Sequence, residues 1–218
     1  MKVLTVVLAA LVVMMAATAF AQSIAPLTQD QPFQIKYASN LDKGESYINI
    51  TNTGANGAPL LGPGFGGAAG NICVNVYAFS PDEQLISCCS CPVTPNGLVN
   101  LGVVRDLTSK TLTGVIPTSA VVKLVATLAG NGSAATCPNS AANGDAAPVL
   151  GMLAWGTTLH LSAVAGTYAT TETPFSVGTL STGERASITG RCAAILGNGS
   201  GFGQCASCKL GGLAPAKK

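Results

Sequence analysis

The distribution of cysteine constrains this chain more than any other feature of its 218-residue sequence. An even number of cysteines in an exported protein is typical of a disulfide framework, but eight cysteines allow roughly a hundred pairings and their spacing does not select one. All eight therefore count as disulfide candidates. They are Cys73, Cys88, Cys89, Cys91, Cys137, Cys192, Cys205 and Cys208.

The N-terminus indicates export. Lys2 supplies a positive charge, Val3–Ala17 is apolar, and Ala19–Ala21 has the small-x-small pattern of a cleavage site. We predict a signal peptide at residues 1–21 and a single secreted domain at residues 22–218, located in the extracellular space, at the cell surface or in a periplasm. A membrane anchor is the alternative, but the apolar run is shorter than the ~20 residues that span a bilayer, and no later stretch approaches that length.

Charge is scarce along the chain. Charged residues make up 9% of it, and without Lys2 its basic and acidic residues nearly balance. No basic stripe is present, which argues against a nucleic-acid partner. A composition rich in Gly, Ala, Ser, Thr and Asn is typical of exported shell or matrix proteins. We therefore expect self-association or binding to other surface proteins, with no membrane span after removal of the signal peptide.

The region with the most cysteines, Ile72–Pro92, has the pattern of a β-hairpin. Val74–Ala78 alternates, with Asn75 and Tyr77 on the face opposite to the apolar residues, which predicts a strand with one buried face. Ser80–Glu83 contains the proline and the aspartate of a turn. A regular hairpin brings its first cysteine within reach of the other three.

Cys88 and Cys89 are adjacent, so in a strand their side chains point to opposite faces. They cannot easily share one partner. We expect one of them to pair toward the core or the hairpin and the other toward a covering segment, such as the helix that contains Cys192 or the predicted loop Gly130–Pro148, which Cys137 would tether. The two cysteines of the C-terminal segment either pair with each other or attach that segment to the hairpin.

Further segments alternate between apolar and polar residues and are separated by turn residues, which suits an antiparallel β-sandwich. In the last of them, Trp155, Leu159 and Leu161 share one face and His160 lies on the other. Arg105–Leu112 is predicted to contain a short helical turn. The predicted strands are Phe33–Tyr37, Glu45–Thr51, Leu98–Val104, Ala120–Leu128 and Leu153–Ser162.

The C-terminal part has a helical pattern. Ser181 and Glu184 have the spacing of a capping box, in which each side chain satisfies a free backbone amide of the other, and Gly197 is placed to end the helix. We predict a helix over about residues 182–196, with Cys192 pairing inward from its apolar stripe. That stripe comprises Ile188, Cys192, Ile195 and Leu196.

Two resemblances follow from these segments. The phrase INITNTG, Ile48–Gly54, is similar to the second strand of bacterial immunoglobulin-like extracellular modules, which implies immunoglobulin-like character for the sandwich. The phrases NICVNVYAF, ISCCSCPVTPNGL, AWGTTLH and GNGSGFGQCASC span most of the predicted secreted domain. They resemble a group of small secreted bacterial proteins without an assigned activity, which implies one secreted unit and no particular chemistry.

Cys88-x-x-Cys91 and Cys205-x-x-Cys208 together have the ligand content of a tetrathiolate zinc site. Export to an oxidising compartment argues against it, and the long separation lacks the compact spacing of zinc ribbons. A redox-active pair would need a helix N-terminus after its first cysteine, whereas Cys88 ends a strand and Cys205 follows a glycine-rich loop. We predict disulfides, with no metal and no cofactor.

Few residues are available for catalysis. His160 is the only histidine, so a Ser-His-acid triad would depend on it, and no Gly-x-Ser-x-Gly motif is present. No motif places the acids as a pair for glycoside hydrolysis either. We predict no catalytic residue and no enzyme. The acids considered are Asp82, Asp106, Glu172 and Glu184.

The sequence thus predicts a mainly β fold, an antiparallel immunoglobulin-like β-sandwich with a C-terminal α-helix, stapled by disulfides. The expected function is a non-enzymatic structural or interaction role at the cell surface or outside the cell. A secreted carbohydrate- or peptide-binding module is the alternative, and clustering of Tyr47, Tyr77 or Trp155 on one exposed face would favour it. A secreted hydrolase built on loop acids is a third hypothesis.

Overall fold

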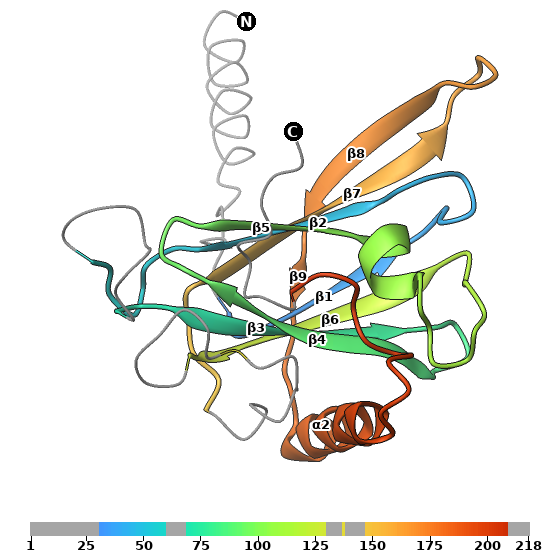
Figure 1. Ribbon diagram of the computed structural model, residues 1–218. Helices are drawn as coiled ribbons and strands as arrows, with labels where there is room; N and C mark the ends of the chain where they lie inside the picture. Colours follow the sequence, from blue (N-terminus) through green and yellow to red (C-terminus); the bar gives the residue numbers. More distant parts are fainter. Residues whose placement is uncertain (1–30, 60–68, 130–136, 138–146, 209–218) are drawn as a thin grey trace, which may run out of the picture.

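The computed structural model describes residues 31–59, 69–129, 137 and 147–208. The predicted signal peptide at residues 1–21 lies outside these residues, as does most of the predicted loop at residues 130–148. In the described part, two antiparallel sheets lie face to face, and a C-terminal helix covers the outer face of one of them (Figure 1). The fold is therefore mainly antiparallel β with a C-terminal helix, as predicted.

Five strands form the first sheet, in the order β4-β3-β6-β1-β9, and four form the second, in the order β5-β2-β7-β8. The strands of the first sheet are β1 (Phe33–Ala38), β3 (Ile72–Phe79), β4 (Leu85–Val93), β6 (Ala120–Leu128) and β9 (Ser176–Val177). The strands of the second sheet are β2 (Tyr47–Asn52), β5 (Leu98–Gly102), β7 (Met152–Leu161) and β8 (Tyr168–Pro174).

Every strand predicted from alternation is present within a few residues of its predicted bounds, whereas the sequence pattern does not predict β8 or β9. The predicted strand Leu98–Val104 ends at Gly102, because the chain there enters one π-helical turn, η1 (Val103–Thr108). This turn takes the place of the helical turn predicted at Arg105–Leu112. The α-helix, α2, spans Thr182–Gly197, close to its predicted bounds.

Alternate residues of the two sheets form the core between them. Ile48 and Ile50 of β2 belong to one buried cluster with Val74 of β3 and Leu124 of β6, and each is at most 2% exposed. Burial of each such side chain stabilises the fold by about 1.5–3 kcal/mol. The alternation of apolar and polar residues that predicts these strands therefore also places the apolar side chains between the two sheets.

The buried face of β7 differs from the apolar face that its sequence suggests. Met152 and Ala154 are buried, and Ala154 pairs with Ile50, so the even-numbered residues of β7 face the core. Trp155 is only partly buried and Leu161 is 66% exposed, on the outer face of the sheet. The small residues Ala154 and Gly156 lie opposite the two isoleucines of β2, and Trp155 and Leu161 remain outside.

Strand β3 is buried on both faces, so the prediction of one buried face is wrong. Asn75 donates through Nδ2 to the Val125 carbonyl and the Thr127 hydroxyl, both at 3.2 Å. Tyr77 is 1% exposed, and desolvation by burial raises the pKa of its phenol. Tyr77 packs in one cluster with Ile188 and Cys192 of α2, a cover that lies about a hundred residues later in the chain. Alternation within β3 could not predict it.

Helix α2 covers this outer face through the apolar stripe that the sequence predicts. Ile188, Cys192 and Ile195 are its buried residues. Ser181 caps the helix by accepting a hydrogen bond from the Glu184 amide at 3.1 Å. The reciprocal half of the predicted capping box is wrong, because the Glu184 carboxylate pairs with Lys123 of β6 instead. The helix start is thus tied to the sheet by charge and its middle by packing.

We predict that removing the disulfide between Cys88 and Cys192 releases α2 selectively. The double variant Cys88→Ala/Cys192→Ala should lose about 2–5 kcal/mol of unfolding free energy, because the bond closes a loop of 104 residues. Amide hydrogen exchange in α2 should rise much more than exchange in β2 and β7, since those strands do not depend on the helix.

The matched control is Cys73→Ala/Cys137→Ala, which removes a staple elsewhere on the hairpin. It should lower stability while leaving α2 protected relative to the rest of the chain. Equal protection of α2 in both variants would contradict the role assigned to the Cys88–Cys192 bond.

Candidate functional site

All eight cysteines are paired in four disulfides, so the predicted disulfide framework is confirmed in the structure. Each bond joins the β3–β4 hairpin to a segment distant in sequence. The pairs are Cys73–Cys137, Cys88–Cys192, Cys89–Cys205 and Cys91–Cys208.

The adjacent cysteines of β4 point to opposite faces, as predicted. Cys88 lies in the apolar cluster beneath α2 and bonds Cys192 of that helix. Cys89 lies in the cluster between the sheets and bonds Cys205 of the C-terminal segment. Cys137, in the predicted loop, bonds Cys73 and not the adjacent pair.

The C-terminal Cys-x-x-Cys attaches to the hairpin and does not pair with itself. Cys89 and Cys91 lie two residues apart on one strand face, so two consecutive staples can reach the same segment. The Cys88 amide donates to the Gly203 carbonyl at 2.9 Å, and the Cys205 amide donates to the Cys88 carbonyl at 3.4 Å. The segment therefore forms a single parallel bridge with β4, between Gln204 and Cys88, and covers the outer edge of β4 there.

The same edge contains the sulfur cluster from which a metal site could have been built. The Sγ atoms of Cys89, Cys91 and Cys208 lie within 4.8 Å of one another, and each of these residues is at most 6% exposed. Zinc and redox partners react with thiolates, and none of these sulfurs is a thiolate in the disulfide pairing. The arrangement present is a covalent staple that solvent barely reaches.

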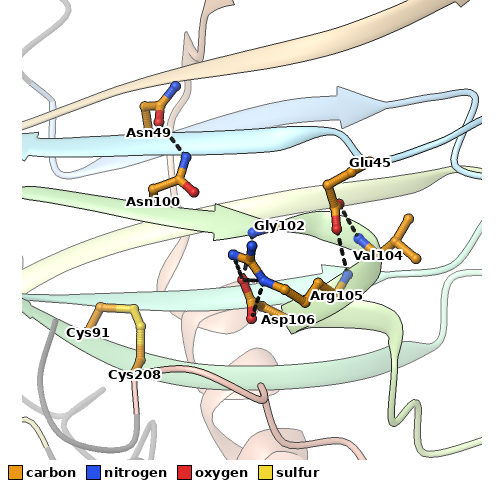
Figure 2. A network of polar contacts seen from close by, with 9 residues as sticks. All are labelled: Glu45, Asn49, Cys91, Asn100, Gly102, Val104, Arg105, Asp106 and Cys208. Atoms are coloured by element: carbon orange, nitrogen blue, oxygen red, sulfur yellow. Dashed lines mark hydrogen bonds and ion pairs between the residues drawn. A yellow bond between two sulfur atoms is a disulfide. The ribbon is translucent and has the colours of Figure 1, made fainter. Parts of the chain in front are cut away.

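A polar network links η1 to the second sheet and to the segment before β2 (Figure 2). The Glu45 carboxylate accepts the amides of Val104 and Arg105 at 2.8 and 2.9 Å. The buried Asp106 carboxylate accepts the Gly102 amide at 2.7 Å and pairs with Arg105, and this bond raises the pKa of the Arg105 guanidinium. The Asp106 carbonyl accepts from an amide of the C-terminal segment. The carboxylates of Glu45 and Asp106 therefore hold the backbone of η1 and of the end of β5 in place.

The remaining candidate catalytic residues have separate positions. Asp82 bonds the Ser80 hydroxyl in the hairpin turn, and Glu184 pairs with Lys123 beside α2. Glu172 lies on β8, and His160 is exposed on β7, three ladder positions away and on the other face. Among the described residues, the structure brings none of these acids together with the histidine.

The aromatic cluster that would favour a sugar- or peptide-binding module lacks one of its three candidate members. Tyr77 is buried beneath α2 and belongs to the other sheet. Tyr47 pairs with Thr157 and Asn49 with Trp155, so Tyr47 and Trp155 are diagonal neighbours on the outer face of the second sheet. Only Tyr47, which is 37% exposed, and Trp155 therefore share an outer face.

A groove lies beside α2, with a volume of about 320 Å³. Its cation, Lys123, already pairs with Glu184 and lies 4.8 Å from the centre of the Phe79 ring. Arg191 borders it and contacts the Glu83 carbonyl at 3.4 Å. Lys123, Glu184 and Arg191 of the groove thus each have a partner within the protein.

The clearest unsatisfied surface is an arm formed by β7 and β8. Pairing of β7 with β2 ends at Thr157, while its pairing with β8 continues to Leu161 and Tyr168. Residues 157–172, here called the β7–β8 ribbon, extend away from the two sheets (Figure 1). All residues of β8 are exposed, and Leu161, Val164 and Tyr168 are 66%, 65% and 44% exposed near the tip.

The hydrogen-bond phase of the ribbon shows which backbone groups are free. The Ser162 amide donates to the Thr167 carbonyl, and the Phe175 amide donates to the Ala154 carbonyl. The pairs 162/167 and 154/175 are therefore hydrogen-bonded pairs of the ladder between β7 and β8. Such pairs alternate with pairs whose amides and carbonyls point away. The backbone groups of Tyr168, Thr170 and Glu172 therefore point away from β7, along an edge that no described strand covers.

The other sheet edges are less open. The C-terminal segment covers β4, and β9 has only two residues. In β5, the outward amide of Gly102 is bonded by Asp106, which leaves Asn100 and Leu98. Unpaired strand edges are sites of association unless they are short, covered or charged, and β8 is long, uncovered and carries one charge, Glu172. The β7–β8 ribbon is the candidate interaction site.

The sequence pattern does not mark this site, because β8 has no buried face. A hydrophobic period marks a strand only where one side is buried, and YATTETP has none. The signal that remains is a cluster of Tyr and Thr, residues that favour strands, after the turn residue Gly166.

No family model, curated protein or solved structure matches the chain. Among the described residues, no helix is long and apolar enough to span a membrane. The assignment of a site thus depends on the geometry of this chain alone.

We predict that Gly203→Ala destabilises the covered edge of β4 more than Gly201→Ala does. Both glycines have left-handed φ, +76° and +75°, so each variant should lose about 1–2 kcal/mol. A Cβ at Gly203 would lie 2.6 Å from the Ile195 side chain, whereas one at Gly201 meets nothing within 4 Å. Overpacking adds about 1–3 kcal/mol at Gly203 only.

Denaturant unfolding with the disulfides intact measures the difference between these two variants. An equal loss of unfolding free energy in both would contradict the tight packing of the C-terminal segment against α2.

Proposed function

We propose that this chain is an exported, non-enzymatic structural protein that acts through protein–protein association along the β7–β8 ribbon. The observation that carries the proposal is the uncovered edge of β8. Its outward backbone groups at Tyr168, Thr170 and Glu172 are donors and acceptors ready to pair with another strand. Main-chain pairing of this kind gives affinity without a pocket or a cofactor.

The covalent framework supports the extracellular part of the proposal. Four disulfides persist in oxidising compartments and are rare in the cytosol. Each stabilises the fold by about 2–4 kcal/mol, which suits a protein that must remain folded without chaperones. The engaged charges of Glu45, Asp106 and Glu184 support the non-enzymatic part, because each already has a structural partner.

We also infer immunoglobulin-like character from the pairing order of the strands. In immunoglobulin domains strand B pairs with strand E in one sheet, and strands C, F and G are neighbours in the other. The pairing of β1 with β6 corresponds to the first arrangement, and the order β2-β7-β8 to the second. The β3–β4 hairpin departs from the pattern, since it takes the place of strand D and contains the staples.

A carbohydrate- or peptide-binding module is the second candidate. The diagonal pair Tyr47 and Trp155 favours it, because exposed aromatic faces can stack on sugars. Trp155→Ala separates the two proposals: it should abolish glycan-array binding if the second holds, and it should leave association through β8 unchanged if the first holds.

We predict that the oxidised chain, purified after export, self-associates and that Thr170→Pro abolishes the association. Proline removes the outward amide of Thr170 and leaves the ladder with β7 intact, a position where strands tolerate proline. Sedimentation velocity over a concentration series measures the change, and electron microscopy shows whether polymers form.

The matched control is Asn100→Pro, which removes an outward amide from the edge of β5. It should leave association unchanged. A wild-type chain that stays monomeric at every concentration, or association that survives Thr170→Pro, would contradict the proposal. Circular dichroism and disulfide mapping confirm that both variants are folded.

A further inference from the structure

We infer that the partner of the β8 edge is the β8 edge of a second copy, paired antiparallel about a two-fold axis at Thr170. The inference rests on the proposed function and names its partner and register. It follows from which backbone groups are free, how far β8 lies from the rest of the chain, and where its charge falls.

The free groups select an antiparallel register. Hydrogen-bonded pairs in an antiparallel ladder exchange two bonds each, and only residues with outward groups can form them. With Thr170 opposite Thr170 of the second copy, Tyr168 lies opposite Glu172 and Glu172 opposite Tyr168. Every outward amide of β8 then has an outward carbonyl opposite it, and no donor is left unpaired.

The neighbouring registers are poorer. A shift toward the base of the ribbon adds the pair Tyr168–Pro174 at each end, but Pro174 has no amide, so each added pair forms one bond and the total does not exceed that of the Thr170 register. It also moves the second copy toward Phe175, which is buried in the body of the protein. A shift toward the tip places Glu172 opposite Gly166, in the turn, outside the ladder.

The side chains fit the same register. Residues opposite one another share a face, so the Glu172 carboxylate meets the Tyr168 hydroxyl of the second copy, a donor–acceptor pair. The only charge of β8 never faces itself. Tyr168, together with Leu161 beside it in the ladder, adds exposed apolar surface that pairing would cover.

A second copy is favoured over head-to-tail pairing of β8 with β5. A β8–β8 interface is the same patch on both copies and closes as a dimer, whereas β8 on β5 would continue as a filament. The edge of β5 offers fewer free amides, since Asp106 accepts the hydrogen bond of the Gly102 amide. Unlike β8, β5 does not extend beyond its sheet (Figure 1).

Charge exchange at Thr170 tests the register. In the oxidised chain, Thr170→Lys and Thr170→Glu each place like charges directly opposite, so each should weaken the dimer roughly threefold to tenfold. An equimolar mixture of the two variants should restore dimerisation to at least the wild-type level. In 1 M NaCl the self-association of Thr170→Lys should recover, because salt screens exposed charges.

Sedimentation equilibrium of each variant and of the mixture gives the dissociation constants. In the register shifted toward the base, the lysine introduced by Thr170→Lys would face Glu172 of the second copy. Stronger self-association of Thr170→Lys would therefore overturn the inference, as would a mixture no tighter than its parts. Loss of association in both Thr170→Pro and Asn100→Pro would indicate pairing of β8 with β5. Each of these results leaves the proposed function standing, which fails if the wild-type chain stays monomeric or if association survives Thr170→Pro.

Discussion

The β3–β4 hairpin is buried on both faces, and the remainder of the structure depends on keeping it so. All residues of β3 and β4 are buried, although the hairpin contains serine, asparagine and cysteine as well as aliphatic residues. The hydroxyls of Ser87 and Ser90 have no hydrogen-bond partner in the described structure, and each such group costs about 1–3 kcal/mol. Disulfides contribute about 2–4 kcal/mol each, which is enough to offset these losses.

The geometry of β4 decides which segment each staple can hold. Adjacent cysteines must diverge, so Cys88 reaches the outer layer and Cys89 the inner one, while Cys91 shares the inner face with Cys89. The three bonds close loops of 104 to 117 residues, which means that their partners come from the last part of the chain. The C-terminal segment therefore covers the edge of β4 and contributes Cys205 and Cys208 to the core between the sheets.

Sequence patterns predicted the elements that have one buried face and missed what depends on distant cover. The strands β1, β2 and β6 and the helix α2 follow from periodicity, and the divergence of Cys88 and Cys89 follows from strand geometry. The burial of Tyr77 could not be predicted, because its cover, α2, is remote in sequence. The disulfide partners required the fold, since spacing leaves roughly a hundred pairings open. The β8 strand was missed because neither of its faces is buried.

The four edge strands of the two sheets differ in how far the rest of the described chain covers them. Backbone pairing with the C-terminal segment covers β4, Asp106 bonds one outward amide of β5, and β9 is short, so three edges are managed within the chain. Among the described residues, no segment covers the edge of β8, and all residues of β8 are exposed. The hydrogen-bond ladder with β7 is therefore what holds β8 in place. The disulfides attach to β3 and β4 of the first sheet, whereas the ribbon belongs to the second sheet. Pairing at β8 therefore leaves every disulfide buried, and a partner strand would supply the hydrogen bonds that the chain itself leaves open.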